Sequence, residues 1–158
     1  MKARYSLPFR SSPNIVRCTA RSHQGHDRHC VDFFMPLGTH VRAARAGVVV
    51  LRESRWNTRL KDLQTAHAGN GVLIRHSDGE ISVYWHAAWR FVFVQKGQRV
   101  RRGQILFLSG DTGYATYPHL HFGVYAPNSG ASIPIDFREA LPPKVPASRY
   151  EGFARGAP

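Results

Sequence analysis

Short apolar runs separated by polar turns recur along the chain and predict β-strands. The runs lie at residues 47–51, 72–76, 81–86, 91–94, 105–108 and 120–125. An Asp-Gly pair at 78–79 separates the second run from the third, which is typical of a β-hairpin. Helical periodicity is nearly absent. We therefore expect an all-β fold, a small domain with antiparallel pairing.

The polar segments between and around these runs predict loops and extensions. The first thirty residues are polar and predicted to be irregular, and residues 52–70 read as one long loop. Long loops in small domains are more often functional than idle. We expect a single domain over residues 1–158, with irregular extensions at 1–21 and 141–158, the second of them extended over the surface.

Composition supports a folded, strongly basic protein. Of the 158 residues, 42% are hydrophobic and 20% charged, which excludes a disordered tail. No apolar stretch approaches the roughly 20 residues of a membrane-spanning helix. The 22 Lys and Arg against 10 Asp and Glu give a formal charge of +12, which suits a polyanion such as nucleic acid, lipid headgroups or an anionic cell wall. A nucleic-acid-binding β-barrel is one candidate, although no recognised nucleic-acid motif is present.

The nine histidines are unevenly placed. They stand at positions 23, 26, 29, 40, 67, 76, 86, 119 and 121. His119 and His121 lie in a predicted strand, where residues two apart point to the same face. Two such imidazoles can bind a metal together, or one can bind while the other transfers protons. Alternatively, both histidines are partly buried and have only a structural role.

A carboxylate adds to this set. Asp32 interrupts an apolar run and would bind a metal or a cation, or accept hydrogen bonds from backbone amides at a turn. His23, His26 and His29 could each supply a nitrogen nearby. His86 ends a predicted strand. It could act as a general base or be a packed core residue. Two histidines, one carboxylate and an open position for water form a common catalytic zinc site, and these donors suit zinc better than magnesium or calcium.

The two cysteines leave their state open. Cys18 and Cys30 lie on either side of the first histidine cluster. They could form a disulfide, remain free thiols, or supply one metal ligand, and a count of two is weak evidence for a compartment.

Four sequence blocks, in order over residues 22–123, resemble the lysostaphin-type zinc endopeptidases, which cut peptide cross-links in bacterial cell walls. The blocks are Ser22-His23 with Asp32-Phe33; Asn70 to His76 with Tyr84-Trp85-His86; Gly97-Gln98-Arg99-Val100-Arg101-Arg102-Gly103-Gln104; and Pro118-His119-Leu120-His121-Phe122. Single blocks are weak signals, but four in order are highly specific.

The resemblance implies a role for each of five side chains. His23, Asp32 and His121 would bind Zn2+, and His86 and His119 would be the general acid/base pair. The sequence departs from the common pattern in the first block, because Arg28 stands where many members have the first histidine. His26 and His29 therefore remain rivals of His23 as the ligand.

The resemblance also implies surroundings for the site. It implies a zinc-bearing groove over the sheet, walled by the long loops 52–70 and 110–118, with Asn70 helping to shape it. Ala87 follows His86 where most members have Leu. Neither departure removes a side chain that the implied zinc site or acid/base pair requires.

The expected function is that of a zinc-dependent endopeptidase acting on the cross-links or stem peptides of peptidoglycan. The alternative is a non-catalytic wall-binding or regulatory module that activates another hydrolase. We expect peptidoglycan as the partner, neither nucleic acid nor a membrane span, and a periplasmic or extracellular location, although Met1 to Pro8 contain no apolar segment typical of a secretory signal.

Overall fold

The computed structural model describes residues 5–18, 23–57, 59–60, 69–115 and 117–146. Within them the chain forms β-strands and one short 3-10 helix, η1 (Gly25–Asp27), and no α-helix. The strands are β1 (Val16–Cys18), β2 (Val31–Phe34), β3 (His40–Arg42), β4 (Gly47–Glu53), β5 (Arg59–Leu60), β6 (Gly71–Arg75), β7 (Ile81–Trp85), β8 (Ala87–Val92), β9 (Arg99–Val100), β10 (Ile105–Ser109), β11 (Gly113–Tyr114) and β12 (His119–Tyr125). The predicted all-β fold is confirmed.

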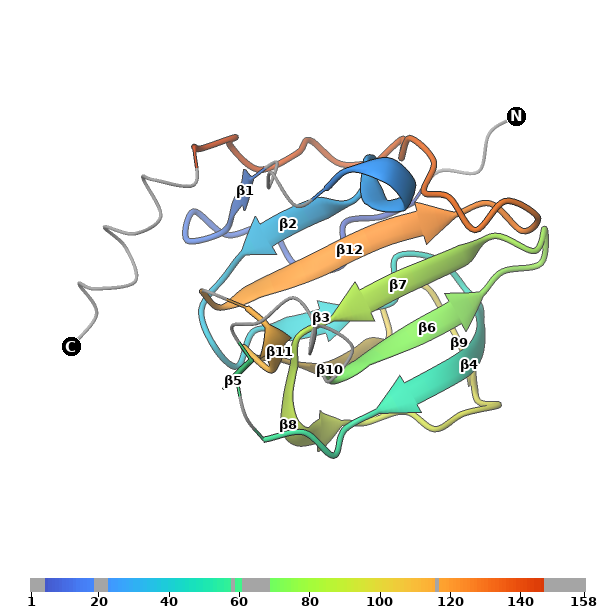
Figure 1. Ribbon diagram of the computed structural model, residues 1–158, viewed down its shortest axis with the longest axis horizontal. Helices are drawn as coiled ribbons and strands as arrows, with labels where there is room; N and C mark the ends of the chain where they lie inside the picture. The colour runs from blue at the N-terminus through green and yellow to red at the C-terminus, as the bar shows by residue number, and fades with distance from the viewer. Residues whose placement is uncertain (1–4, 19–22, 58, 61–68, 116, 147–158) are drawn as a thin grey trace.

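Three sheets organise these strands (Figure 1). The main sheet has seven strands in the order β1-β2-β12-β7-β6-β4-β9, and a second sheet has the order β3-β10-β8. All their pairings are antiparallel, whereas β11 and β5 form a small parallel pair. No helix among the described residues is long and apolar enough to cross a bilayer.

The hairpin of β6 and β7 forms where the sequence predicts it. Arg75 pairs with Ile81, and the turn between them includes Gly79, whose φ of 86° lies in the left-handed region that glycine adopts readily. The backbone N–H of Gly79 donates to the carbonyl of His76 at 3.0 Å. The Asp-Gly signal therefore gave the correct turn.

Alternation along β12 gives the main sheet two different faces. Leu120, Phe122 and Val124 are fully buried and face the core. The intervening positions, which include His119 and His121, therefore lie on the other face. That outer face carries the residues of chemical interest.

One hydrophobic core lies between the main sheet and the second sheet. It combines Phe122 and Ile74 of the main sheet with Val41, Val92 and Phe107 of the second sheet. The N-terminal segment also belongs to this core through four side chains that are at most 5% exposed: Tyr5, Leu7, Phe9 and Ile15.

Several local expectations differ from the structure. The N-terminal region, expected to be irregular, contains β1 and η1, and β2 and β3 add strands where none was predicted. These strands are short, and long-range pairing rather than their own pattern stabilises them. β8 begins at Ala87, ahead of the predicted run at 91–94.

The expected loop and tail are partly described. In the loop 52–70, β4 continues to Glu53 and β5 occupies 59–60, while residues 61–68 lie outside the described part of the chain. The tail lies beside β1, because Arg17 donates its N–H to Pro143 and accepts that of Val145, both at 3.0 Å. Residues 147–158 lie outside the described part.

Candidate metal and acid–base centre

The register between β2 and β12 brings Asp32 beside His121. His119 pairs with Phe34 and His121 with Asp32, so both histidines and the carboxylate share the outer face of the main sheet. Asp32 and His119 are buried, and the His121 side chain is 16% exposed. Sequence positions 89 residues apart thus supply neighbouring side chains.

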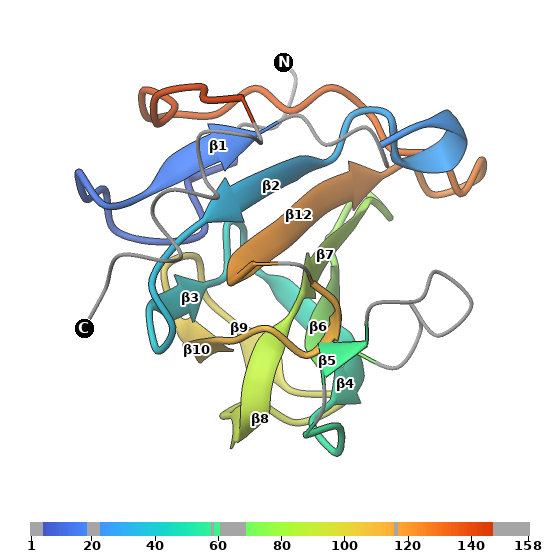
Figure 2. The same cartoon turned by 60° about the vertical axis from the view of Figure 1, so that its left-hand side comes forward.

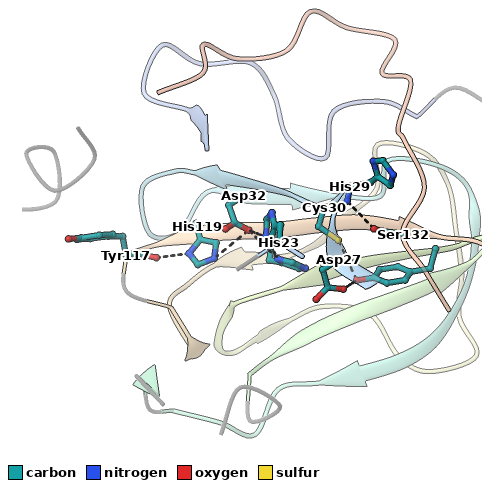
Figure 3. A network of polar contacts seen from close by, with 10 residues as sticks. His23, Asp27, His29, Cys30, Asp32, Tyr117, His119 and Ser132 are labelled. Carbon is teal, nitrogen blue, oxygen red and sulfur yellow. Dashed lines mark hydrogen bonds and ion pairs between the residues drawn. The ribbon is translucent and has the colours of Figure 1, made fainter. Parts of the chain in front are cut away.

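His23 completes a compact group of three donor atoms. Its Nε2 lies 3.2 Å from Asp32 Oδ1 and 3.2 Å from His121 Nδ1, and the last two atoms are 3.1 Å apart (Figure 3). His26 is exposed, and neither it nor His29 belongs to this group. Three histidines of the N-terminal region were candidate ligands. Of these, only His23 lies next to Asp32 and His121 in the structure.

The spacing of the three atoms fits a tetrahedral zinc ion. Zinc bonds to histidine nitrogen or carboxylate oxygen of about 2.0–2.1 Å place neighbouring ligands of a tetrahedron roughly 3.3 Å apart. The observed triangle has edges of 3.1 to 3.2 Å. Two imidazoles and one carboxylate would leave the fourth position to water or substrate, as in catalytic zinc sites.

Mutual attraction within the group stabilises its charged forms. Burial acts to raise the pKa of Asp32, but the electrostatic interaction with His119 and the hydrogen bonds from His121 and His23 hold that pKa well below its usual range. Burial acts to lower the pKa of His121, but Asp32 and then Cys30 raise it to about 10. The carboxylate is therefore ionised at neutral pH, and a cation bound here would replace protons.

His86 and His119 form a second pair of imidazoles next to this group. Their ring centroids are 4.3 Å apart. His86 Nδ1 donates to the carbonyl of Thr112 and His119 Nδ1 to the carbonyl of Tyr117, each at 2.7 Å. Because a carbonyl can only accept, both Nδ1 atoms carry hydrogen, and a neutral ring has its lone pair on Nε2.

Burial keeps these two rings neutral. Burial lowers the pKa of His86 well below 6.5, and the nearby His119 lowers it further. Burial also lowers the pKa of His119, although the charge of Asp32 opposes this effect. His86 has a φ of 73°, a left-handed conformation that costs energy in a residue with a side chain and that recurs at functional sites.

Asn70 connects the backbone segments around His86. Its side-chain amide donates to the carbonyl of Trp56 at 2.7 Å, and its Oδ1 accepts the N–H of Trp56 at 3.0 Å. Its own N–H donates to the hydroxyl of Thr112, which in turn donates to the carbonyl of Ala87. Asn70 thus ties down Thr112, the residue that orients His86.

A further polar group fixes the segment between His23 and Asp32. The hydroxyl of Tyr125 donates to Asp27 at 2.5 Å and lies 3.3 Å from the sulfur of Cys30. The N–H of His29 donates to the hydroxyl of Ser132 at 3.0 Å (Figure 3). Cys18 and Cys30 are both free and buried, so the structure contains neither a disulfide between them nor a sulfur in the donor triangle.

Apart from Asn70, the residues that position the site were not identified from the sequence. Thr112 and Tyr117 act through backbone carbonyls, which no side-chain pattern reveals. Tyr125 follows His121 at the spacing that shares a strand face, a signal that could have found it. Of the remaining histidines, His40 is exposed and His76 is buried against Ser82, while His67 lies outside the described residues.

The family model "Peptidase family M23" matches residues 26–134, more than half of the chain. The chain belongs to peptidase family M23. The resemblance to lysostaphin-type enzymes stated from the sequence blocks is therefore confirmed.

Curated relatives in the M23 family include enzymes of two named specificities. The peptidoglycan DD-endopeptidase ShyA of Vibrio cholerae is 41% identical over 91 residues, covering 58% of this chain and 18% of ShyA. The glycyl-glycine endopeptidase ALE-1 of Staphylococcus capitis is 39% identical over 98 residues, covering 62% of this chain and 24% of ALE-1. The chain thus spans about a fifth to a quarter of the length of these relatives.

Solved M23 structures share the fold. The catalytic domain of lysostaphin from Staphylococcus simulans is 29% identical with a TM-score of 0.53, and the match covers 84% of this chain and 85% of that domain. A structure described as a zinc containing peptidase from Vibrio cholerae is 27% identical with a TM-score of 0.56, and the match covers 89% of this chain and 36% of that one.

Proposed function

We propose that this chain is the catalytic domain of a zinc endopeptidase that hydrolyses peptide cross-links or stem peptides of bacterial peptidoglycan. The observation that carries the proposal is the donor triangle of His23, Asp32 and His121 with two neutral imidazoles beside it. M23 membership and the peptidoglycan-cutting relatives support the same reaction.

In this proposal His23 Nε2, Asp32 Oδ1 and His121 Nδ1 hold the zinc ion. When bound, zinc would lower the pKa of a coordinated water to about 7 and polarise the carbonyl of the scissile bond. The hydrogen bonds that now join the three side chains show that their donor atoms already converge. Little rearrangement is needed for them to bind an ion.

His86 and His119 are the acid–base pair of the proposed reaction. Each presents a neutral Nε2, which can accept a proton from the attacking water, and the resulting imidazolium can donate that proton to the leaving amine. The hydrogen bonds to Thr112 and Tyr117 keep the proton of each neutral ring on Nδ1 and fix the orientation of the ring. A protonated histidine also stabilises negative charge that develops on the carbonyl oxygen.

The expected substrate is inferred from the names of the relatives and from the net charge of the chain. The names of ShyA and ALE-1 describe cleavage of a DD-bond and of a glycyl-glycine bond, so we expect a D-residue or glycine next to the bond that this chain cuts. The charge of +12 suits an anionic wall. We place the enzyme in the periplasm or outside the cell, where that wall is. A substrate groove walled by loops 52–70 and 110–118 remains a prediction.

The proposal is tested by mass spectrometry of purified peptidoglycan incubated with the protein, with and without a zinc chelator. New amine-ended fragments that disappear with the chelator are expected, and their masses identify the bond. His26→Ala is the matched control, because His26 is exposed and outside the donor triangle. Intact peptidoglycan after incubation with zinc-loaded protein would overturn the proposal in favour of a non-catalytic wall-binding module.

A further inference from the structure

The outer face around the β3-β10-β8 sheet exposes three aromatic side chains, two at a register irregularity in β8 and one directly after that strand. Val41, Val92 and Phe107 are register partners whose side chains enter the core. Trp89, Phe91 and Phe93 instead lie in solvent, with exposures of 40%, 50% and 52%. They are three of the six large apolar side chains that are exposed in the described part of the chain, and they fall within five residues. Clustered exposure of this kind marks interaction surfaces.

The same sheet lacks acidic residues. Asp and Glu are absent from residues 33–52, which contain β3 and most of β4, and from residues 81–110, which contain β8, β9 and β10. Basic residues in these two stretches are Arg42, Arg45, Arg52, Arg90, Lys96, Arg99, Arg101 and Arg102. The guanidinium of Arg90 stacks on Trp89 at 4.3 Å from the ring centroid, so a cation and an aromatic ring form one surface.

A cationic hollow lies at the other edge of this sheet. It has a volume of about 250 Å³ and is lined by Arg10, Gly38, Thr39, His40 and Arg42. Arg42 donates from Nη1 to the carbonyl of Gly103 at 2.9 Å, while its buried Nε has no hydrogen-bond partner among the described residues. A carboxylate entering this hollow would find several N–H donors.

We propose that this outer face, which we call the basic aromatic face (Arg10, His40, Arg42, Trp89, Arg90, Phe91 and Phe93), docks the glycan–peptide strands of peptidoglycan. The proposal rests on the proposed function, which supplies the polymer. Exposed aromatic rings offer flat apolar surfaces to sugar rings, and arginines bind the carboxylates of stem peptides. Charge complementarity favours this anionic occupant, because no acidic side chain from the strands of this sheet would repel it.

The position of the basic aromatic face suits a polymer that is held while another part of it is cut. β8 begins at Ala87, directly after His86, and runs away from β12 (Figure 2). Trp89, the first of the three aromatic residues, therefore follows His86 by three residues along the chain but belongs to a different sheet from β12. A strand docked there would remain next to the site between cleavage events, which raises the local substrate concentration on an insoluble wall.

The test is co-sedimentation with purified peptidoglycan from which phosphate polymers have been removed, in the presence of a zinc chelator. Because the chelator prevents hydrolysis, binding is measured independently of the proposed reaction. Phe91→Ser combined with Phe93→Ser, and separately Arg42→Gln, should each weaken binding about tenfold. Leu37→Ser and Arg138→Gln are matched controls at exposed positions outside the defined face, and they should bind as the unmodified protein does.

A second measurement separates docking from misfolding. Zinc-loaded Phe91→Ser/Phe93→Ser protein should cleave a short soluble cross-linked peptide within about twofold of the unmodified rate, but digest insoluble wall more slowly. Unchanged sedimentation of both face variants would overturn the docking proposal. Loss of binding to anionic vesicles or DNA without loss on peptidoglycan would also overturn it and assign the face to another polyanion.

Discussion

The sulfur of Cys30 occupies the space in which a side chain on residue 123 would begin. A Cβ built on Gly123 would collide with Cys30 Sγ, and it would also lie 3.2 Å from the ring of Tyr125. Gly123 lies on the same face of β12 as His121, two residues further along. The close approach therefore sets how tightly the segment carrying Cys30 and Asp32 packs beside the donor triangle.

This contact predicts a paired effect of two substitutions. Gly123→Ala alone should lower the free energy of unfolding by about 1–3 kcal/mol, because the new methyl group overpacks a buried site. Cys30→Ala removes the sulfur, so the double variant should be more stable than the sum of the two single effects predicts. Urea unfolding of the four proteins measures the coupling, and strictly additive free energies would contradict the contact.

Metal binding and proton transfer should be separable by substitution. Asp32→Ala and His121→Ala should lose both zinc and activity, because each removes a donor atom from the triangle. His119→Ala should keep most of its zinc while activity falls by roughly 10²–10⁴-fold, the usual contribution of a general acid or base. Zinc content by atomic emission and the rate of cross-link cleavage give the two readouts. Equal zinc loss in His119→Ala would reassign His119 as a ligand.

Removing the Asn70 amide should disturb His86 through Thr112. Asn70→Ala leaves the N–H and carbonyl of Trp56 without their partners, which should cost about 1–3 kcal/mol of stability. The rate of cleavage should fall more than substrate affinity, because the orientation of His86 depends on Thr112. Asn128→Ala, at an exposed position, is the control. Unfolding of Asn70→Ala at the same urea concentration as the unmodified protein would contradict this role.

Acid should destabilise the fold in part through His76, which is remote from the donor triangle. His76 donates from Nδ1 to the carbonyl of Ala46 at 2.8 Å, and its Nε2 lies 2.9 Å from the hydroxyl of Ser82. Burial lowers the pKa of His76 below the 6.5 of the unfolded chain. Below about pH 6.5 the unfolded state therefore binds a proton that the folded state does not, and stability falls until the folded pKa is passed.

A substitution isolates this effect of pH. His76→Gln should be less stable than the unmodified protein at pH 7, but its free energy of unfolding should fall less between pH 7 and pH 5.5. Chemical unfolding at several pH values measures both slopes, with His40→Gln as a control at an exposed histidine. Parallel slopes for the unmodified and His76→Gln proteins would show that His76 titrates alike in both states.

Local signals in the sequence predict the hairpin well and the N-terminal region poorly. The turn at 78–79 and the alternation on either side of it are contained in one short stretch, so no distant partner is needed to read them. β2 is different, because Asp32 interrupts its apolar pattern and one of its two partner strands, β12, is distant in the sequence. The N-terminal segment likewise has too little pattern to reveal that Tyr5, Leu7, Phe9 and Ile15 enter the core.

The sequence by itself determined the fold class, the family blocks and the residue types available for zinc and acid–base chemistry. These properties depend on residue identity and on short spacings, such as the two-residue spacing of His119 and His121 on one strand face. Tertiary structure decided that His23 rather than His26 or His29 meets Asp32, and that Thr112 and Tyr117 orient the imidazoles of His86 and His119. Pairing between distant strands and hydrogen bonds to backbone carbonyls fix those choices, and neither leaves a mark in the local sequence.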